Sequence, residues 1–296
     1  MKTLFVLGLA VLAFFPASAE VMSVELSLDQ DQFLPSEAIP LTVKITNRSG
    51  QQLHLGADPD WLTFNVEATD GFVVMKNAEV PVAGEFDLET AQLALKHVDI
   101  QPYFSMMKPG RYRITATLHV KDWGAQISSM PKSLDVIQGA KLWAQDFGVR
   151  NGTNRIPEAR KYTLEQANYL KEQLRLYVQV SDGSEALVYK VSALGPMVSF
   201  CHPEAQVDRL SRLNVVWQTG AQAFSYAIVN PDGTVAETDY YDNFYSRPHL
   251  AVDVEGTVVV MGGTRRPKPV EMPVVKSPSE LPALSKPAPI PVPDPK

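Results

Sequence analysis

The sequence predicts an all-β protein with two antiparallel domains and a proline-rich tail. Three observations lead to this prediction. Apolar residues alternate with polar ones through residues 20–138, a repeat of about 45 residues with hairpin turns occupies residues 157–266, and ten of the 23 prolines lie in residues 267–296. The order of domains follows from these three composition shifts.

The first 19 residues have the pattern of a secretory signal peptide. Lys2 supplies the positive charge, and an Ala-Ser-Ala cleavage site ends at Ala19. The apolar run Leu4–Phe15 falls short of the roughly 20 residues that a membrane span needs, which argues against the alternative of an uncleaved anchor. We therefore expect cleavage after Ala19, a periplasmic or secreted protein, and no transmembrane segment in the mature chain.

Net charge limits the possible partners, and the cysteine count limits the possible covalent cross-links. Removing residues 1–19 removes one lysine and no acid, so the formal net charge changes from −6 to −7. An acidic chain is poorly suited to binding a phosphate backbone, so we expect no nucleic-acid partner. Cys201 is the single cysteine, which excludes an internal disulfide.

The strand from Lys108 to Val120 is the clearest element of the first domain. It places Tyr112 and every second residue after it on one apolar face. Pro109 and Gly110 permit a sharp crossing from one sheet to another just before it. From there the hydroxyl of Tyr112 can turn back to a backbone group, which is the tyrosine corner of sandwich domains.

These residues carry a resemblance. Leu34-Pro35-Ser36-Glu37, the strand that ends at Asn47, and Pro109-Gly110-Arg111-Tyr112 together resemble bacterial Ig-like and fibronectin-like β-sandwich domains. The resemblance implies an Ig-like β-sandwich over residues 20–138. The cysteine pair of antibody domains is absent, which excludes that subtype.

Residues 139–156 are interpreted as a connection between the domains. They contain Trp143 and Phe147, and we expect these two rings to pack against one of the domains, because a solvated linker would not need them.

The second domain, residues 157–266, contains an internal repeat. Pro157, Pro203 and Pro248 each open a similar segment, with offsets of 46 and 45 residues. This period is typical of a four-stranded propeller blade, but two units and a fragment cannot close a propeller. We therefore expect blade-like antiparallel repeats in an open arrangement. Residues 160–172 are compatible with a helix or a strand, and the repeat favours a strand.

The tail, residues 267–296, is too rich in proline for a packed core and is predicted to be a disordered, extended spacer. A docking segment for another envelope protein or for the cell wall is the alternative.

The sequence contains no catalytic motif. The five histidines show no metal-ligand spacing, and Cys201 with His202 would point to opposite faces of a strand. The acidic turns Asp29-Gln30-Asp31 and Asp58-Pro59-Asp60 could offer oxygens to calcium, but solvated turns are the preferred interpretation. We therefore expect no catalytic residue, no metal site and no cofactor.

One cluster is a candidate contact surface. Aromatic rings interleave here with polar groups, as they do at protein or sugar interfaces, although the rings could instead belong to the core. The cluster comprises Tyr240, Tyr241, Asp242, Phe244, Tyr245 and Arg247.

Three functions remain open. The first is an exported, non-enzymatic binding or scaffold protein of the cell envelope, with an envelope protein or glycan as its partner. The second is a carbohydrate-binding or cell-wall accessory protein, which would need the aromatic loop to be exposed. The third is a hydrolase whose acidic residues and histidines converge in a cleft.

Overall fold

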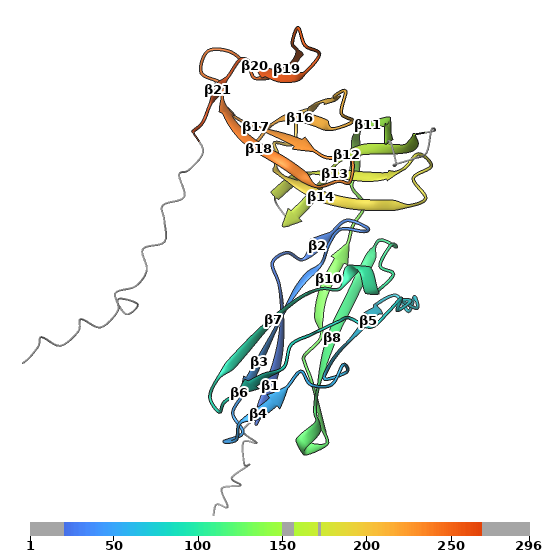
Figure 1. The fold of residues 1–296 in the computed structure, drawn as a ribbon, viewed down its shortest axis with the longest axis vertical. Coiled ribbons are helices and arrows are strands. Elements are labelled where there is room, and N and C mark those ends of the chain that lie inside the picture. The colour runs from blue at the N-terminus through green and yellow to red at the C-terminus, as the bar shows by residue number, and fades with distance from the viewer. Residues whose placement is uncertain (1–20, 150–156, 171–172, 268–296) are drawn as a thin grey trace, which may run out of the picture.

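The structure is a computed structural model that describes residues 21–149, 157–170 and 173–267. Strands make up 57% of the described residues and helix 3%, which confirms the all-β prediction. The predicted signal peptide and all but the first residue of the predicted tail lie outside the described residues. Two units follow each other along the long axis of the molecule (Figure 1). Within the described ranges, we find no helix with the length and apolar character of a membrane span.

The first unit consists of two facing sheets. One has the order β1 (Met22–Leu28), β3 (Pro40–Asn47), β7 (Leu93–Asp99). The other has the order β2 (Gln32–Phe33), β10 (Lys132–Val136), β8 (Gly110–Val120), β5 (Leu62–Ala68), and β9 (Ala125–Ser128) also pairs with β8. A short separate pair is formed by β4 (Leu53–Leu55) and β6 (Phe86–Leu88). The described strands from β1 to β10 therefore form two layers of antiparallel and mixed sheet.

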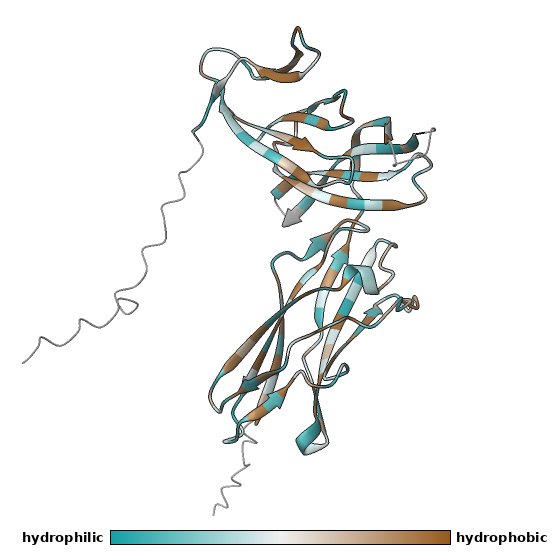
Figure 2. Ribbon diagram, in the orientation of Figure 1, coloured by the Kyte–Doolittle hydropathy of each residue, from teal (hydrophilic) through white to brown (hydrophobic). Residues whose placement is uncertain are grey.

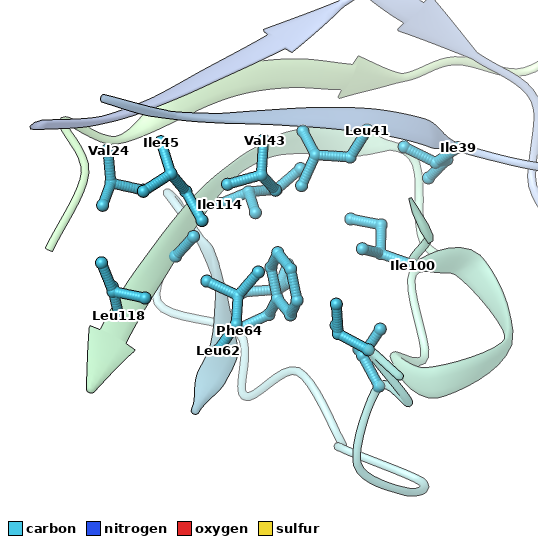
Figure 3. Close-up of a cluster of buried hydrophobic side chains, with 14 of the residues drawn as sticks. Val24, Ile39, Leu41, Val43, Ile45, Leu62, Phe64, Ile100, Ile114 and Leu118 are labelled. Carbon is cyan, nitrogen blue, oxygen red and sulfur yellow. The ribbon is translucent and has the colours of Figure 1, made fainter. Parts of the chain in front are cut away.

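The core of the first unit lies between its two sheets. Leu41, Val43 and Ile45 alternate along β3 and are fully buried. Figure 3 shows them on the same side of their strand, with Ile114 and Leu118 of β8 in the same cluster. Burying each such side chain contributes about 1.5–3 kcal/mol, so the period-two pattern determines which faces meet.

Tyr112 forms the predicted corner. The chain leaves β7, makes the 3₁₀ turn η1 (Gln101–Tyr103), and enters β8 in the opposite sheet. The Tyr112 hydroxyl donates a hydrogen bond to the carbonyl oxygen of Lys108 at 2.6 Å, and its ring is buried. The roles predicted for Pro109, Gly110 and Tyr112 are therefore consistent with the observed crossing.

The second unit contains three stacked layers. The first sheet has the order β11 (Ala140–Val149), β12 (Glu158–Leu170), β13 (Gln173–Asp182), β14 (Val188–Pro196). The second has the order β15 (Glu204–Val207), β16 (Leu213–Gln218), β17 (Ala223–Val229), β18 (Val235–Asp242), β21 (Thr264–Arg265). The third is the hairpin β19 (His249–Val252) and β20 (Val258–Met261).

The structure corrects the interpretation of residues 139–156 as a connection. Residues 140–149 form β11, which pairs antiparallel with β12 along its whole length, so the second unit begins at residue 140. The predicted packing of Trp143 and Phe147 is confirmed, because Phe147 is buried and stacks on Tyr162 with ring centroids 4.1 Å apart. The strand favoured for residues 160–172 is confirmed for residues 160–170 by β12, and residues 171 and 172 lie outside the described residues.

Apolar clusters fill both spaces between the layers. Leu164 and Val178 of the first sheet meet Val215 and Trp217 of the second, and all four are buried. The opposite face of the second sheet packs Val216 and other residues against the β19–β20 hairpin. The layers stack face to face like blades, and no sheet of the described residues closes into a barrel or propeller.

One turn recurs within this unit. Asp182 is the last residue of β13, and Asp208, Asn230 and Asp253 directly follow β15, β17 and β19. The carbonyl oxygen of each accepts a hydrogen bond from the amide three residues later. That later residue has a positive φ at every turn: Glu185, Ser211, Gly233 and Gly256. A tight turn followed by a left-handed residue joins antiparallel strands with the correct twist, so the repeated turn explains the regular hairpins.

The two units meet through a small apolar cluster. Leu34 of the first unit packs with Ala167, Tyr177 and Val191 of the second. An isolated parallel β-bridge joins Glu37 to Val191. Both backbone pairing and side-chain burial therefore hold the units together.

Candidate functional site

The predicted aromatic cluster lies at one end of the layers of the second unit. Asp242 ends β18 opposite Ala223, the first residue of β17. The backbone amide of Gly263, just after β20, donates to Ser246 O at 2.9 Å, which ties the hairpin to the same loop. The strand ends and residues 243–248 therefore share one end of the unit, near β21 in Figure 1.

Three rings of this cluster point to solvent. Tyr245 is 96% exposed, Phe244 is 61% exposed and Tyr240 is 50% exposed. The interpretation of the whole cluster as core is therefore wrong for these residues. Large exposed rings are uncommon on a folded surface. Three of them within residues 240–245 therefore point to a contact surface.

The other members of the predicted cluster have partners within the chain. Tyr241 is partly buried and packs beneath the β19–β20 hairpin. Asp242 accepts hydrogen bonds from two guanidinium nitrogens of Arg266, which lowers the pKa of its carboxyl. The guanidinium of Arg247 lies 5.5 Å from the ring centroid of Phe224. These residues shape the surface by fixing the strands and the loop beneath it.

Two further exposed apolar residues belong to the same end. The loop before β15 contains Phe200, 80% exposed, and it is attached here because Val198 N donates to Gln218 O at 3.1 Å. Met261 ends β20 and is also exposed. The sequence pattern did not identify Phe200 or Met261, because neighbouring strand ends are visible only in the folded chain. We call these five side chains the aromatic end: Phe200, Tyr240, Phe244, Tyr245 and Met261.

The remaining candidate chemical groups lie outside the aromatic cluster. Among the described residues, no three of the His, Cys, Asp and Glu side chains are grouped in a way that could hold a metal ion. Cys201 is buried, and its nearest polar partner is the carbonyl oxygen of His202 at 3.6 Å. His54 instead pairs with Asp87 at 2.8 Å, and this contact raises the pKa of the imidazole.

The first unit has a hollow of about 450 Å³ at the end away from the second unit, lined in part by Asp58 and His119. Some of its polar side chains are engaged locally. Asp58 forms an ion pair with Lys121 at 3.0 Å, and the indole nitrogen of Trp61 donates to Val82 O at 2.8 Å. The aromatic end, where large exposed rings concentrate, is the better candidate.

Comparisons with known proteins add no functional assignment. No family model and no curated protein matches the chain. Among solved structures, it is similar to the sporulation control protein Spo0M from Bacillus subtilis, with 11% identity and a TM-score of 0.30. That similarity covers 57% of this chain and 83% of the other.

Proposed function

We propose that this chain is an exported, non-enzymatic binding or scaffold protein of the cell envelope, and that it holds a partner protein at the aromatic end. The observation that supports this most is the exposure of Phe244 and Tyr245 in one short loop. Aromatic side chains supply large contact area at low entropic cost, and they dominate binding energy when they lie centrally in an interface.

A protein partner fits this surface better than a glycan. Sugar recognition needs hydrogen-bonding groups beside the stacking ring, and here Asp242 is already engaged by Arg266. The other exposed side chains of the aromatic end, Phe200 and Met261, are apolar, and one is a flat ring whereas the other is a flexible chain. Mixed apolar side chains of this kind are enriched at protein interfaces. A glycan of the envelope remains the second candidate because the rings themselves are accessible.

The decisive experiment is site-specific photo-crosslinking in the native envelope. A photoreactive phenylalanine analogue replaces Tyr245, and the matched control carries it at Phe72, an exposed ring of the first unit. We expect a discrete crosslinked protein from position 245 and none from position 72. Equal products from both positions, or none from either, would contradict a protein partner at the aromatic end.

A binding measurement then separates protein from glycan. Phe244→Ala combined with Tyr245→Ala should weaken binding of the crosslinked protein by about thirtyfold or more, the effect of losing a strong aromatic contact. Retention of purified envelope polysaccharide by the unmodified protein, abolished by the same substitutions, would instead identify the glycan. Unchanged melting temperature is the required control, since both rings are exposed.

Export is tested separately. The intact mass of the mature protein should correspond to a chain that begins at Glu20. A mature protein that still carries residues 1–19 would contradict this part of the proposal.

A further inference from the structure

The third layer of the second unit stops halfway through the repeat. In the second layer, the hairpin β15–β16 continues into β17 and β18. The hairpin β19–β20 begins 45 residues after β15, yet no third strand pairs with β20 in the described part of the chain. The third layer therefore has two strands where each of the others has at least four.

Two glycines explain why the repeat ends here. Gly262 and Gly263 both have positive φ, of 72° and 67°, and they turn the chain away from β20. A Cβ on Gly262 would lie 2.6 Å from the carbonyl oxygen of Arg247, so only glycine fits this passage. The chain then pairs with β18 as β21, so it does not continue along the outer edge of β20.

The free edge of β20 presents backbone hydrogen-bonding groups. Asp253 N donates to Thr257 O at 3.0 Å, which closes the hairpin and sets the alternation of its ladder. By that alternation, the N–H and C=O groups of Val258 and Val260 point away from β19. On the opposite edge of the hairpin, the N–H of Leu250 donates to a carboxylate oxygen of Glu204 at 2.9 Å. Among the described residues, no comparable hydrogen bond covers Val258 or Val260.

The composition of this edge also favours strand pairing. Val258–Met261 contains no charged residue and no proline. Natural edge strands are usually protected by charges, prolines or bulges, because an apolar β-branched edge recruits another strand. Figure 2 colours the hairpin mostly hydrophobic.

We propose that β20 pairs antiparallel with β20 of a second copy of this chain across a two-fold axis. The two hairpins together form a four-stranded sheet, which is the strand number of the complete first layer, β11–β14. A two-fold axis places the same apolar segment opposite itself, so no charge is buried and no unlike partner is required. β20 adjoins the aromatic end through Met261, its last residue, whereas the rings Tyr240, Phe244 and Tyr245 lie outside β20.

The chain's own tail is a poorer occupant of this edge. Prolines interrupt residues 268–296 so often that no more than four consecutive residues are free of them. Proline cannot donate to a ladder, so such a segment cannot pair continuously along β20.

The test is the oligomeric state of the mature chain, residues 20–296, by sedimentation velocity over a series of concentrations. Val260→Pro removes one outward N–H and leaves the hairpin's own ladder intact. Val260→Ala is the matched control, because it loses the packing of the same side chain but keeps the N–H. We expect a concentration-dependent dimer for the unmodified chain and for Val260→Ala, and dimerisation at least about tenfold weaker for Val260→Pro.

Several results would overturn the proposal. One is a monomer at every concentration for the unmodified chain. Another is an equal dissociation constant for Val260→Pro and Val260→Ala. A dimer that forms only when residues 268–296 are removed would show that the tail occupies the edge instead.

Discussion

Asp208 and Asp253 lie 45 residues apart, and each holds a hairpin turn with the same set of hydrogen bonds. The Oδ1 atom of each accepts from the amides two and four residues later, at 2.8 and 2.9 Å for Asp208 and 2.9 and 2.8 Å for Asp253. The repeat seen in the sequence is therefore, at these two positions, a repeat of turn chemistry.

The two aspartates should differ in their contribution to stability. Asp208 also accepts from Arg212 Nε at 2.9 Å, and its side chain is only 3% exposed, whereas Asp253 is exposed. Asp208→Ala removes the acceptor of three hydrogen bonds, two of them part-buried, and should lower the free energy of unfolding by about 1–3 kcal/mol. Asp253→Ala should cost less, because water replaces the carboxylate. Urea denaturation measures both, and an equal or larger cost for Asp253→Ala would contradict this interpretation.

Two turn glycines give a separate test of backbone strain. Gly256 has a φ of 78° and open space where a Cβ would stand, so Gly256→Ala should cost about 1–2 kcal/mol from the left-handed conformation alone. Gly233 has a φ of 85°, and an added Cβ would lie 2.8 Å from Lys190 Cβ. Gly233→Ala should therefore cost more than Gly256→Ala in the same denaturation experiment. A reversed order would show that the loop at Gly233 relaxes freely.

The first unit could be predicted well because its signals are local. Period-two alternation identified Leu41, Val43 and Ile45 as one buried face, and Pro109-Gly110 placed the sheet crossing next to Tyr112. Each of these features depends on a few neighbouring residues. The strand period alone determines which side chains meet the core.

The second unit was harder to predict because its layers depend on distant pairing. Residues 140–149 have weak alternation and a mostly exposed pattern, so only their pairing with β12 identifies them as a strand. In the candidate site, Tyr241 and Phe244 are close in sequence and chemically alike. The hairpin β19–β20 covers Tyr241 and leaves Phe244 exposed, a difference that arises from tertiary stacking.

The corner at Tyr112 leads to a prediction about a single hydroxyl. Tyr112→Phe leaves the buried ring in place and removes the donor to Lys108 O, so it should lower the free energy of unfolding by about 1–3 kcal/mol. Tyr240→Phe is the control, since its ring is half exposed and its loss of a hydroxyl should have little effect. Identical denaturation midpoints for Tyr112→Phe and the unmodified protein would remove the structural role assigned to the corner.

The joint between the units should respond to pH through Glu37. This carboxylate is buried beside the bridge to Val191, and it accepts hydrogen bonds from Leu34 N at 2.7 Å and Gln30 Nε2 at 2.9 Å. Burial raises the pKa of Glu37 above its ordinary value of 4.5, and these hydrogen bonds and the charge of Arg175 offset only part of that effect. The protonated form is therefore favoured by folding more than it is in the unfolded chain.

The direction of the pH dependence follows from this shift. A raised pKa in the folded state contributes stability that is fully present below the ordinary value of 4.5 and is lost as pH rises through the folded pKa. The stability of the unmodified protein relative to Glu37→Gln should therefore fall as pH rises above the ordinary value of 4.5. Asp29 and Arg175 line the same small cavity of about 290 Å³, but both proteins contain them, so the difference between the two isolates Glu37. Melting temperatures over a pH series provide the measurement, and a difference that stays constant or grows with pH would show that Glu37 is not desolvated at the joint.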